Sequence, residues 1–265
     1  MRNLRTILVL ALSASISAAF SISYAQELTG REVMERVEAQ SEVDDETTIM
    51  TMKLINKKGK EQIRQAEQAV KTGDEGTKTL IRFLKPRDIE GTGLLTVEHK
   101  EDASDQWLYL PALRRTRRIP SGGRTDSFMG TDFSFEDLSP ENLEVHSYKV
   151  IRSEEVDGQA CYVVEAVPAT EKEKKESGYG RRELSVRKDN FLIVQVKYYN
   201  KKNEWVKVSH SKDIEEVESG VWRSNTLEMH NVKRNHRTIL IIEERKMNQG
   251  ISDGLFTPRS LERWK

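Results

Sequence analysis

The feature that most constrains the fold is a period-two alternation of apolar and polar residues, repeated in short segments along most of the chain. The first such segment, Thr48–Leu54, places Met50, Met52 and Leu54 on one face of a strand. Turn signals such as Asp157-Gly158 separate the segments at intervals of about ten residues. Short strands at this spacing predict an antiparallel meander that curls toward a barrel.

Twelve segments have the alternation and length of strands. In the first half of the chain, we predict strands at Thr48–Leu54, Arg64–Lys71, Thr77–Leu84, Leu94–Glu98, Trp107–Leu110 and Arg114–Ile119. In the second half, we predict strands at Cys161–Val167, Arg181–Lys188, Phe191–Tyr199, Trp205–Ile214, Trp222–Lys233 and Thr238–Lys246. Helices are few and short: Thr29 and Glu32 have the spacing of a capping box, which predicts a helix ending near Ser41. The protein is therefore expected to be mainly β.

The first 25 residues are typical of a secretory signal peptide. Arg2 and Arg5 precede an apolar stretch, and small residues lead to a cleavage site near Ala25. We therefore expect an exported protein whose mature part, residues 26–265, forms a single domain.

Composition excludes several classes of protein. The mature part has a net charge of about −2, which argues against a general nucleic-acid binder. It has no apolar run of the ~18 residues that an integral membrane span needs. Cys161 is the only cysteine, so no intramolecular disulfide can form and stability must come from the core.

A search for catalytic chemistry finds no recognisable pattern. The five histidines form no HExxH motif, there is no G-x-S-x-G elbow, and Gly91-Thr92-Gly93 lacks the third glycine of a dinucleotide site. We therefore predict no enzymatic activity, no metal site and no cofactor. An exported hydrolase with a pair of catalytic carboxylates is the least favoured alternative.

Positive charge is concentrated in one short region that also contains aromatic residues. Its arginines are Arg114, Arg115, Arg117, Arg118 and Arg124. They either form a solvated surface paired with nearby acids, or a rim that contacts an anionic head group or a partner protein. Charge on both faces of the predicted Arg114–Ile119 strand indicates an edge strand or a protruding hairpin.

The aromatic segment Phe128–Phe135 also has two interpretations. Phe133 and Phe135 could pack under the sheet as core, or Phe128 and Met129 could cover the mouth of a cavity, with Gly130 as a hinge.

The motifs of this region resemble those of a known family. They are Gly91-Thr92-Gly93-Leu94-Leu95, Trp107-Leu108-Tyr109-Leu110-Pro111, Arg114-Arg115-Thr116-Arg117-Arg118-Ile119 and Gly130-Thr131-Asp132-Phe133-Ser134-Phe135-Glu136-Asp137-Leu138. Together with the leader, the short helix and the meander, they resemble the bacterial outer membrane lipoprotein-sorting protein family of LolA-like periplasmic proteins, which are often linked to RND-type exporters. The resemblance implies an incomplete antiparallel β-barrel wrapped around short helices and enclosing an apolar cavity.

From the resemblance and the absence of a nucleophile, we expect a periplasmic carrier or exchange protein for lipid or lipoprotein acyl chains, serving an inner-membrane exporter. A sensor of envelope stress with the same fold is the alternative. The residues expected to line the lipid cavity are Met50, Met52, Leu54, Trp107, Tyr109, Phe128, Met129, Phe133 and Met229. The five arginines are expected to contact the head group or the partner.

Overall fold

All the strands belong to one antiparallel sheet. The computed structural model describes residues 27–99 and 102–263, and its 13-stranded sheet has the order β6-β5-β4-β3-β2-β1-β13-β12-β11-β10-β9-β8-β7. Among the described strands, β6 and β7 are the two edges, so the sheet curls without closing. The predicted mainly β fold, an incomplete antiparallel barrel, is confirmed, whereas the predicted signal peptide lies outside the described residues.

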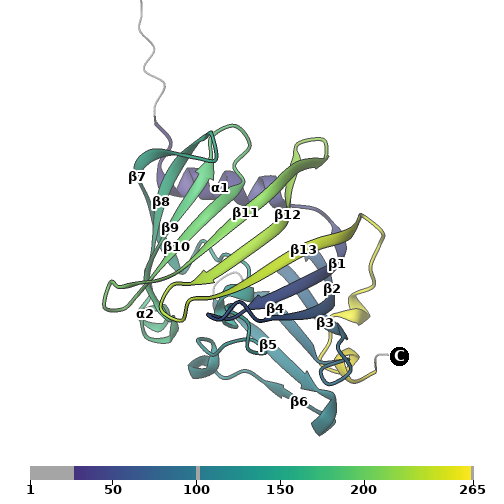
Figure 1. Cartoon of the computed structure of the whole chain (residues 1–265). Coiled ribbons are helices and arrows are strands. Elements are labelled where there is room, and N and C mark those ends of the chain that lie inside the picture. The colour runs from purple at the N-terminus through teal and green to yellow at the C-terminus, as the bar shows by residue number, and fades with distance from the viewer. Residues whose placement is uncertain (1–26, 100–101, 264–265) are drawn as a thin grey trace, which may run out of the picture.

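The sheet has two arms (Figure 1). After helix α1 (Gly30–Ser41), the first arm comprises β1 (Asp45–Ile55), β2 (Glu61–Gly73), β3 (Gly76–Lys85), β4 (Gly93–His99), β5 (Asp102–Leu110) and β6 (Arg115–Arg118). The second arm comprises β7 (His146–Val156), β8 (Gln159–Pro168), β9 (Tyr179–Arg187), β10 (Ile193–Asn200), β11 (Trp205–Glu218), β12 (Val221–Asn231) and β13 (His236–Met247). Helix α2 (Glu171–Glu176) lies between β8 and β9. Pairing of the first strand, β1, with the last, β13, joins the arms.

Strand β1 shows how alternation builds the inner face of the curl. Met50, Met52 and Leu54 are all buried, while the residues between them are partly exposed. On the β13 side, Met50 is paired with Ile242, next to a register shift. The inner face is therefore apolar at the junction of the two arms.

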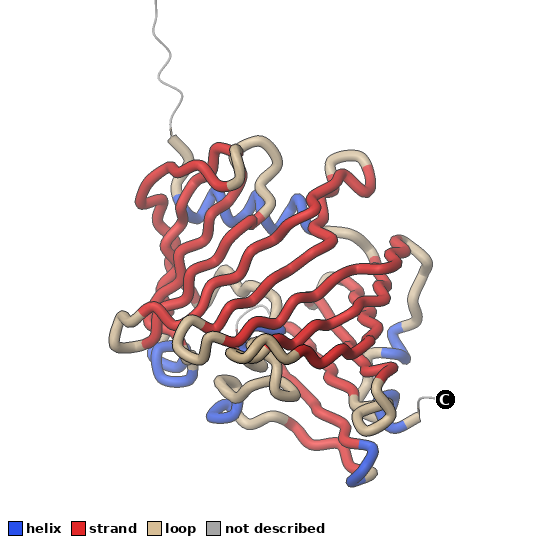
Figure 2. Tube along the Cα trace, in the orientation of Figure 1, coloured by secondary structure: helices blue, strands red, loops and turns tan. Residues whose placement is uncertain are grey.

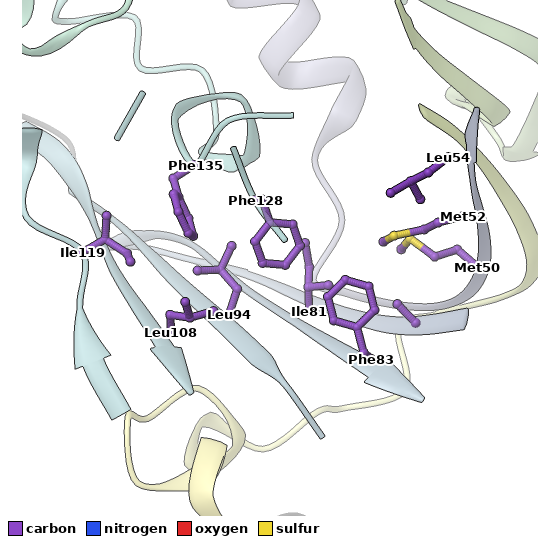
Figure 3. Packing of buried hydrophobic residues seen from close by; sticks show 11 residues of the cluster. Met50, Met52, Leu54, Ile81, Phe83, Leu94, Leu108, Ile119, Phe128 and Phe135 are labelled. Atoms are coloured by element: carbon purple, nitrogen blue, oxygen red, sulfur yellow. The ribbon is translucent and has the colours of Figure 1, made fainter. Parts of the chain in front are cut away.

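The connection between β6 and β7, residues 119–145, lies on this inner face, and we call it the strap. Its short helical turns and loops stand out from the strands in Figure 2. Phe128 of the strap stacks on Phe83 of β3 at 5.6 Å between ring centroids and meets Phe135 edge-on at 5.8 Å (Figure 3). Phe133 and Phe135 are buried, as the core interpretation predicts.

Helix α1 closes one end of the second arm. Thr29 and Glu32 form the predicted capping box, with the Thr29 backbone N–H donating to Glu32 Oε2 at 2.7 Å. Val33 and Met34 are buried in a cluster with apolar residues of β8 and β9. Gly30 lies so close to β7 that a Cβ atom there would be 2.4 Å from the backbone nitrogen of Lys149.

The outer face of the first arm is covered by the C-terminal segment, residues 248–263. Phe256 and Leu261 pack on Leu80 and Leu95 there. The carboxylate of Asp45 holds the start of this segment by accepting backbone N–H groups at 2.8, 2.8 and 3.1 Å. Both faces of β3–β5 are consequently buried.

Candidate functional site

A cavity of about 400 Å³ lies between the strap and the inner face of the sheet, at the junction of the two arms. Its volume is in the range of pockets that hold one small ligand. Its apolar wall consists of Met50, Met52, Ile81, Phe128, Phe133, Leu138, Leu227, Leu240 and Ile242. A surface of this kind favours hydrocarbon over water by roughly 25 cal/mol per Å² of buried apolar area.

Most of the predicted cavity residues lie in or beside this cavity. Met50, Met52, Phe128 and Phe133 line it. Three more predicted residues pack against these four but do not line the cavity itself. They are Leu54 and Met129, which pack in the cluster around Met50, and Met229, which packs with Phe133.

Trp107 and Tyr109 are placed elsewhere. They pack with Phe256 and Leu261 on the outer face, under the C-terminal segment. Leu108, between them on β5, is the residue that points into the inner cluster. The expectation that the two aromatic residues line the same cavity as Met50 therefore does not fit the geometry.

The inner wall also includes residues that sequence reasoning missed. Ile81, Leu227, Leu240 and Ile242 are apolar residues of correctly predicted strands. Alternation could have assigned them a face within each strand, but not the strand that would lie opposite.

One end of the cavity is polar. The carboxylate of Glu46, near the start of β1, accepts hydrogen bonds from Nε of Arg223 at 2.9 Å and from Nε of Arg245 at 2.8 Å. Thr48, Gln68 and Arg245 line the cavity at this end. Since the apolar wall begins at Met50, polarity decreases along β1 into the cavity.

The strap is fastened to β13 by a buried aspartate. Asp132 Oδ2 accepts the Thr238 hydroxyl at 2.8 Å, and the Asp132 backbone N–H donates to the same hydroxyl oxygen at 2.9 Å. His236 Nδ1 is 2.6 Å from the same carboxylate oxygen. Thr238 is fully buried, so each of these polar groups depends on the others for its hydrogen bonds.

A second aspartate fastens the strap to β9 and β11. Asp137 forms a buried ion pair with Lys207 and accepts the Tyr179 hydroxyl at 2.8 Å. Burial and the negative charge of Asp137 raise the pKa of Tyr179 well above its usual value, so the phenol remains a donor. The Lys207 ammonium also lies 5.1 Å from the centre of the Tyr179 ring.

Near its end, the strap is held by Glu141. Its carboxylate accepts two hydrogen bonds from Arg182 of β9, at 2.7 and 2.8 Å, and one from the Tyr148 hydroxyl at 2.6 Å. Burial alone would raise the pKa of Glu141, but the Arg182 guanidinium and the Tyr148 hydroxyl lower it to about 2. On the other arm, Gln106 donates to the Phe135 carbonyl at 2.9 Å. The strap therefore bridges both arms over the cavity.

The structure separates the five arginines. Arg115, Arg117 and Arg118 lie on β6, which is the edge strand that their pattern predicts. Arg114 is not in the strand: it has a φ of 47° in the turn before β6. Arg118 pairs with Asp105, while no ion pair links Arg114, Arg115 or Arg117 to another described residue.

Arg124 belongs to the interior rather than to this edge. Its guanidinium donates to both oxygens of Glu173 in α2, at 2.9 and 3.1 Å, and only 12% of its side chain is exposed. This geometry fits a structural tie between the strap and α2 instead of a contact for a partner.

Two observations bear on what the described residues can do. No group of three or more of their His, Cys, Asp and Glu side chains is arranged to hold a metal ion. None of the helices in the described ranges has the length and apolar composition to cross a membrane. The apolar wall and polar end of the cavity under the strap suit an amphipathic molecule.

Comparison with known proteins agrees with this geometry. The sequence matches a family model, described as "Uncharacterized protein", over residues 75–263. A crystal structure of an outer membrane lipoprotein-sorting protein domain from Vibrio parahaemolyticus is 29% identical, with a TM-score of 0.83, and the match covers 88% of this chain and 98% of that one. The chain belongs to the family of this model, and it is similar to the lipoprotein-sorting domain over nearly the whole length of both chains.

Two further structures are similar to this family member. A DUF1329 family protein from Desulfovibrio piger is 29% identical, with a TM-score of 0.81, over 88% of this chain and 97% of that one. A LolA superfamily protein from Nitrosomonas europaea shares the fold, with 16% identity and a TM-score of 0.69 over 87% of this chain and 98% of that one. The predicted family resemblance is confirmed. No curated protein matches the sequence.

Proposed function

We propose that this protein is a periplasmic carrier or exchange protein that binds the acyl chains of lipid or lipoprotein cargo in the cavity under the strap. The observation that supports this most directly is the cavity of about 400 Å³ at the junction of the arms, whose apolar wall includes Met50, Met52 and Phe128. Each CH₂ group moved from water to such a wall gains about 0.8 kcal/mol. Binding and release of this kind need no nucleophile, so the proposal includes no catalytic step.

Similarity to a solved structure supports the same proposal. The Vibrio parahaemolyticus structure is named for lipoprotein sorting, and its fold covers nearly the whole of both chains. Sorting of this kind takes place in the periplasm, which agrees with the leader-like residues at the start of the sequence. We accordingly propose that the protein acts between the two membranes.

The arginine edge, defined as Arg114, Arg115, Arg117 and Arg118, is proposed as the contact for a partner. Three of these guanidinium groups have no carboxylate partner among the described residues, so their charge is available to phosphate or carboxylate groups. An inner-membrane exporter of the RND type is the partner we propose. Replacing all four arginines by glutamine is expected to leave folding intact and weaken capture of the partner from envelope extract. Unchanged capture of the partner would favour the interpretation of the arginine edge as an ordinary solvated surface.

The carrier proposal is tested by lipid that co-purifies with the mature protein, identified by mass spectrometry. Leu240→Trp should fill the cavity and reduce the amount of bound lipid, because Leu240 is part of the cavity wall. Ile239→Trp is the matched control, since Ile239 is the neighbouring residue on β13 and points to the opposite face. Equal lipid content in wild type and both variants, or no lipid and no uptake of an acyl probe, would contradict the proposal.

The envelope-stress sensor remains the alternative function, and the same capture experiment separates the two. An exporter as the captured partner supports transport, whereas a signalling membrane protein supports sensing.

A further inference from the structure

Three polar side chains at the polar end of the cavity have no hydrogen-bond partner within the described residues. Thr48 is 5% exposed, and its hydroxyl oxygen is buried without a partner. Gln68 and Thr79 also line the cavity, and no hydrogen bond links either side chain to the rest of the described protein. A buried hydroxyl that makes no hydrogen bond destabilises the folded protein, so its presence at a cavity wall needs an explanation.

These side chains are neighbours on the inner face. Thr48 of β1 is paired directly with Gln68 of β2, and Gln68 is paired with Ile81 of β3. Directly paired side chains have Cβ atoms about 4.5–5.5 Å apart. Thr79 precedes Ile81 by two residues on the same face of β3. The three polar groups thus form a short row across β1–β3.

The row lies where the apolar wall begins. Met50 is the next inward-facing residue of β1 after Thr48, at a distance of about 7 Å along the strand. On the other side of Thr48, the Glu46 carboxylate is already occupied by Arg223 and Arg245. The charged groups at this end are therefore largely paired with one another, whereas the neutral side chains of the row still lack hydrogen-bond partners among the described residues.

We infer that Thr48, Gln68 and Thr79 form a subsite for the acyl linkage of the cargo, meaning the ester or amide carbonyl at the head of the acyl chain. A threonine hydroxyl and a glutamine amide both donate to a carbonyl oxygen. A hydrocarbon chain bonded to that carbonyl would then extend over Met50 and Met52. This inference rests on the proposed function and narrows the ligand class from apolar molecules in general to acyl esters and amides.

The first part of the test compares the binding of two probes to the same set of variants. The first probe is dodecanoylglycerol, which carries an acyl ester, and the second is diphenylhexatriene, a hydrocarbon without hydrogen-bonding groups. Thr48→Val keeps the shape of the side chain but removes the hydroxyl, and Gln68→Leu removes the amide. Each substitution is expected to weaken dodecanoylglycerol binding about threefold to tenfold and to leave diphenylhexatriene binding unchanged.

Thr47→Val is the matched control, because Thr47 is adjacent in β1 and points to the opposite face. It should change neither dissociation constant. A dodecanoyl-cysteinyl peptide, in which the same chain is attached through an amide, is the second acyl probe. Tighter binding of the peptide identifies lipoprotein as the source of the linkage, and tighter binding of the glycerol ester identifies a glycerolipid.

The outcomes distinguish the subsite from the carrier proposal. Equal losses of both probes in Thr48→Val, or no loss of dodecanoylglycerol binding in either variant, would refute the subsite while leaving the carrier intact. Wild-type protein that binds none of the probes would overturn the carrier proposal itself.

Discussion

Replacement of Glu141 by glutamine should loosen the strap and remove a measurable part of the acid sensitivity of the protein. Glu141 keeps its shape as glutamine but loses the charge that Arg182 contacts through two hydrogen bonds. Arg182 is only 16% exposed, so the variant leaves a largely buried guanidinium without its partner. The wild type should therefore be more stable than Glu141→Gln at neutral pH.

The magnitude follows from the pKa of the carboxyl. The Glu141 pKa is lowered from 4.5 to about 2 in the folded protein. A lowered pKa contributes stability that is fully present above the unfolded value and is lost as pH falls toward the folded value. Linkage gives about 3 kcal/mol at pH 7 and about 1 kcal/mol at pH 3. The stability difference between wild type and Glu141→Gln should therefore shrink by about 2 kcal/mol from pH 7 to pH 3.

Urea unfolding of both proteins at pH 7 and pH 3 measures this difference. Glu171→Gln is the control, because Glu171 pairs with Lys174 on the surface and is 91% exposed. It should leave stability nearly unchanged at either pH. A Glu141→Gln difference that stays constant from pH 7 to pH 3 would show that the Arg182 pair does not hold the strap as described.

Three further substitutions test the packing. Phe128→Ala should lower the free energy of unfolding by about 3–5 kcal/mol and enlarge the cavity, because Phe128 is 2% exposed and packs between two other rings. An unchanged free energy of unfolding in urea would contradict that packing. Thr238→Val should cost about 2 kcal/mol by leaving Asp132 short of hydrogen bonds, and a gain in melting temperature would refute this tie. Gly30→Ala should destabilise the protein, since the added Cβ would lie 2.4 Å from the β7 backbone. Helix propensity alone predicts that alanine raises stability by up to about 1 kcal/mol, so a rise in melting temperature would contradict the close packing of α1 on β7.

Alternation predicted twelve of the described strands, and all of these except the exposed edge strand β6 have at least one face that packs on apolar neighbours. It missed β7 (His146–Val156), an edge strand whose residues are mostly exposed and whose register shifts between Val150 and Arg152. A strand with little buried surface and an internal irregularity has no strong period of two.

The same reasoning explains the mixed result for the cavity. Met50 and Met52 line the cavity because β1 alternates cleanly and its apolar face points inward. Trp107 and Tyr109 lie on the outer face, because β5 is covered on both faces and the larger apolar residues do not identify the inner one. Ties such as Glu141 to Arg182 depend on the three-dimensional route of the strap, which has no periodic pattern to reveal it.

Pairing of β1 with β13 has a consequence for how the protein matures. Neighbouring strands within each arm are consecutive in the sequence, but the seam between Met52 and Leu240 connects nearly opposite ends of the sequence. Long-range pairing of this kind is slow, since the loop must close before its contacts are gained. The cavity under the strap therefore forms only when the final strand docks, so a chain in which β13 has not yet paired has no such cavity to offer a ligand.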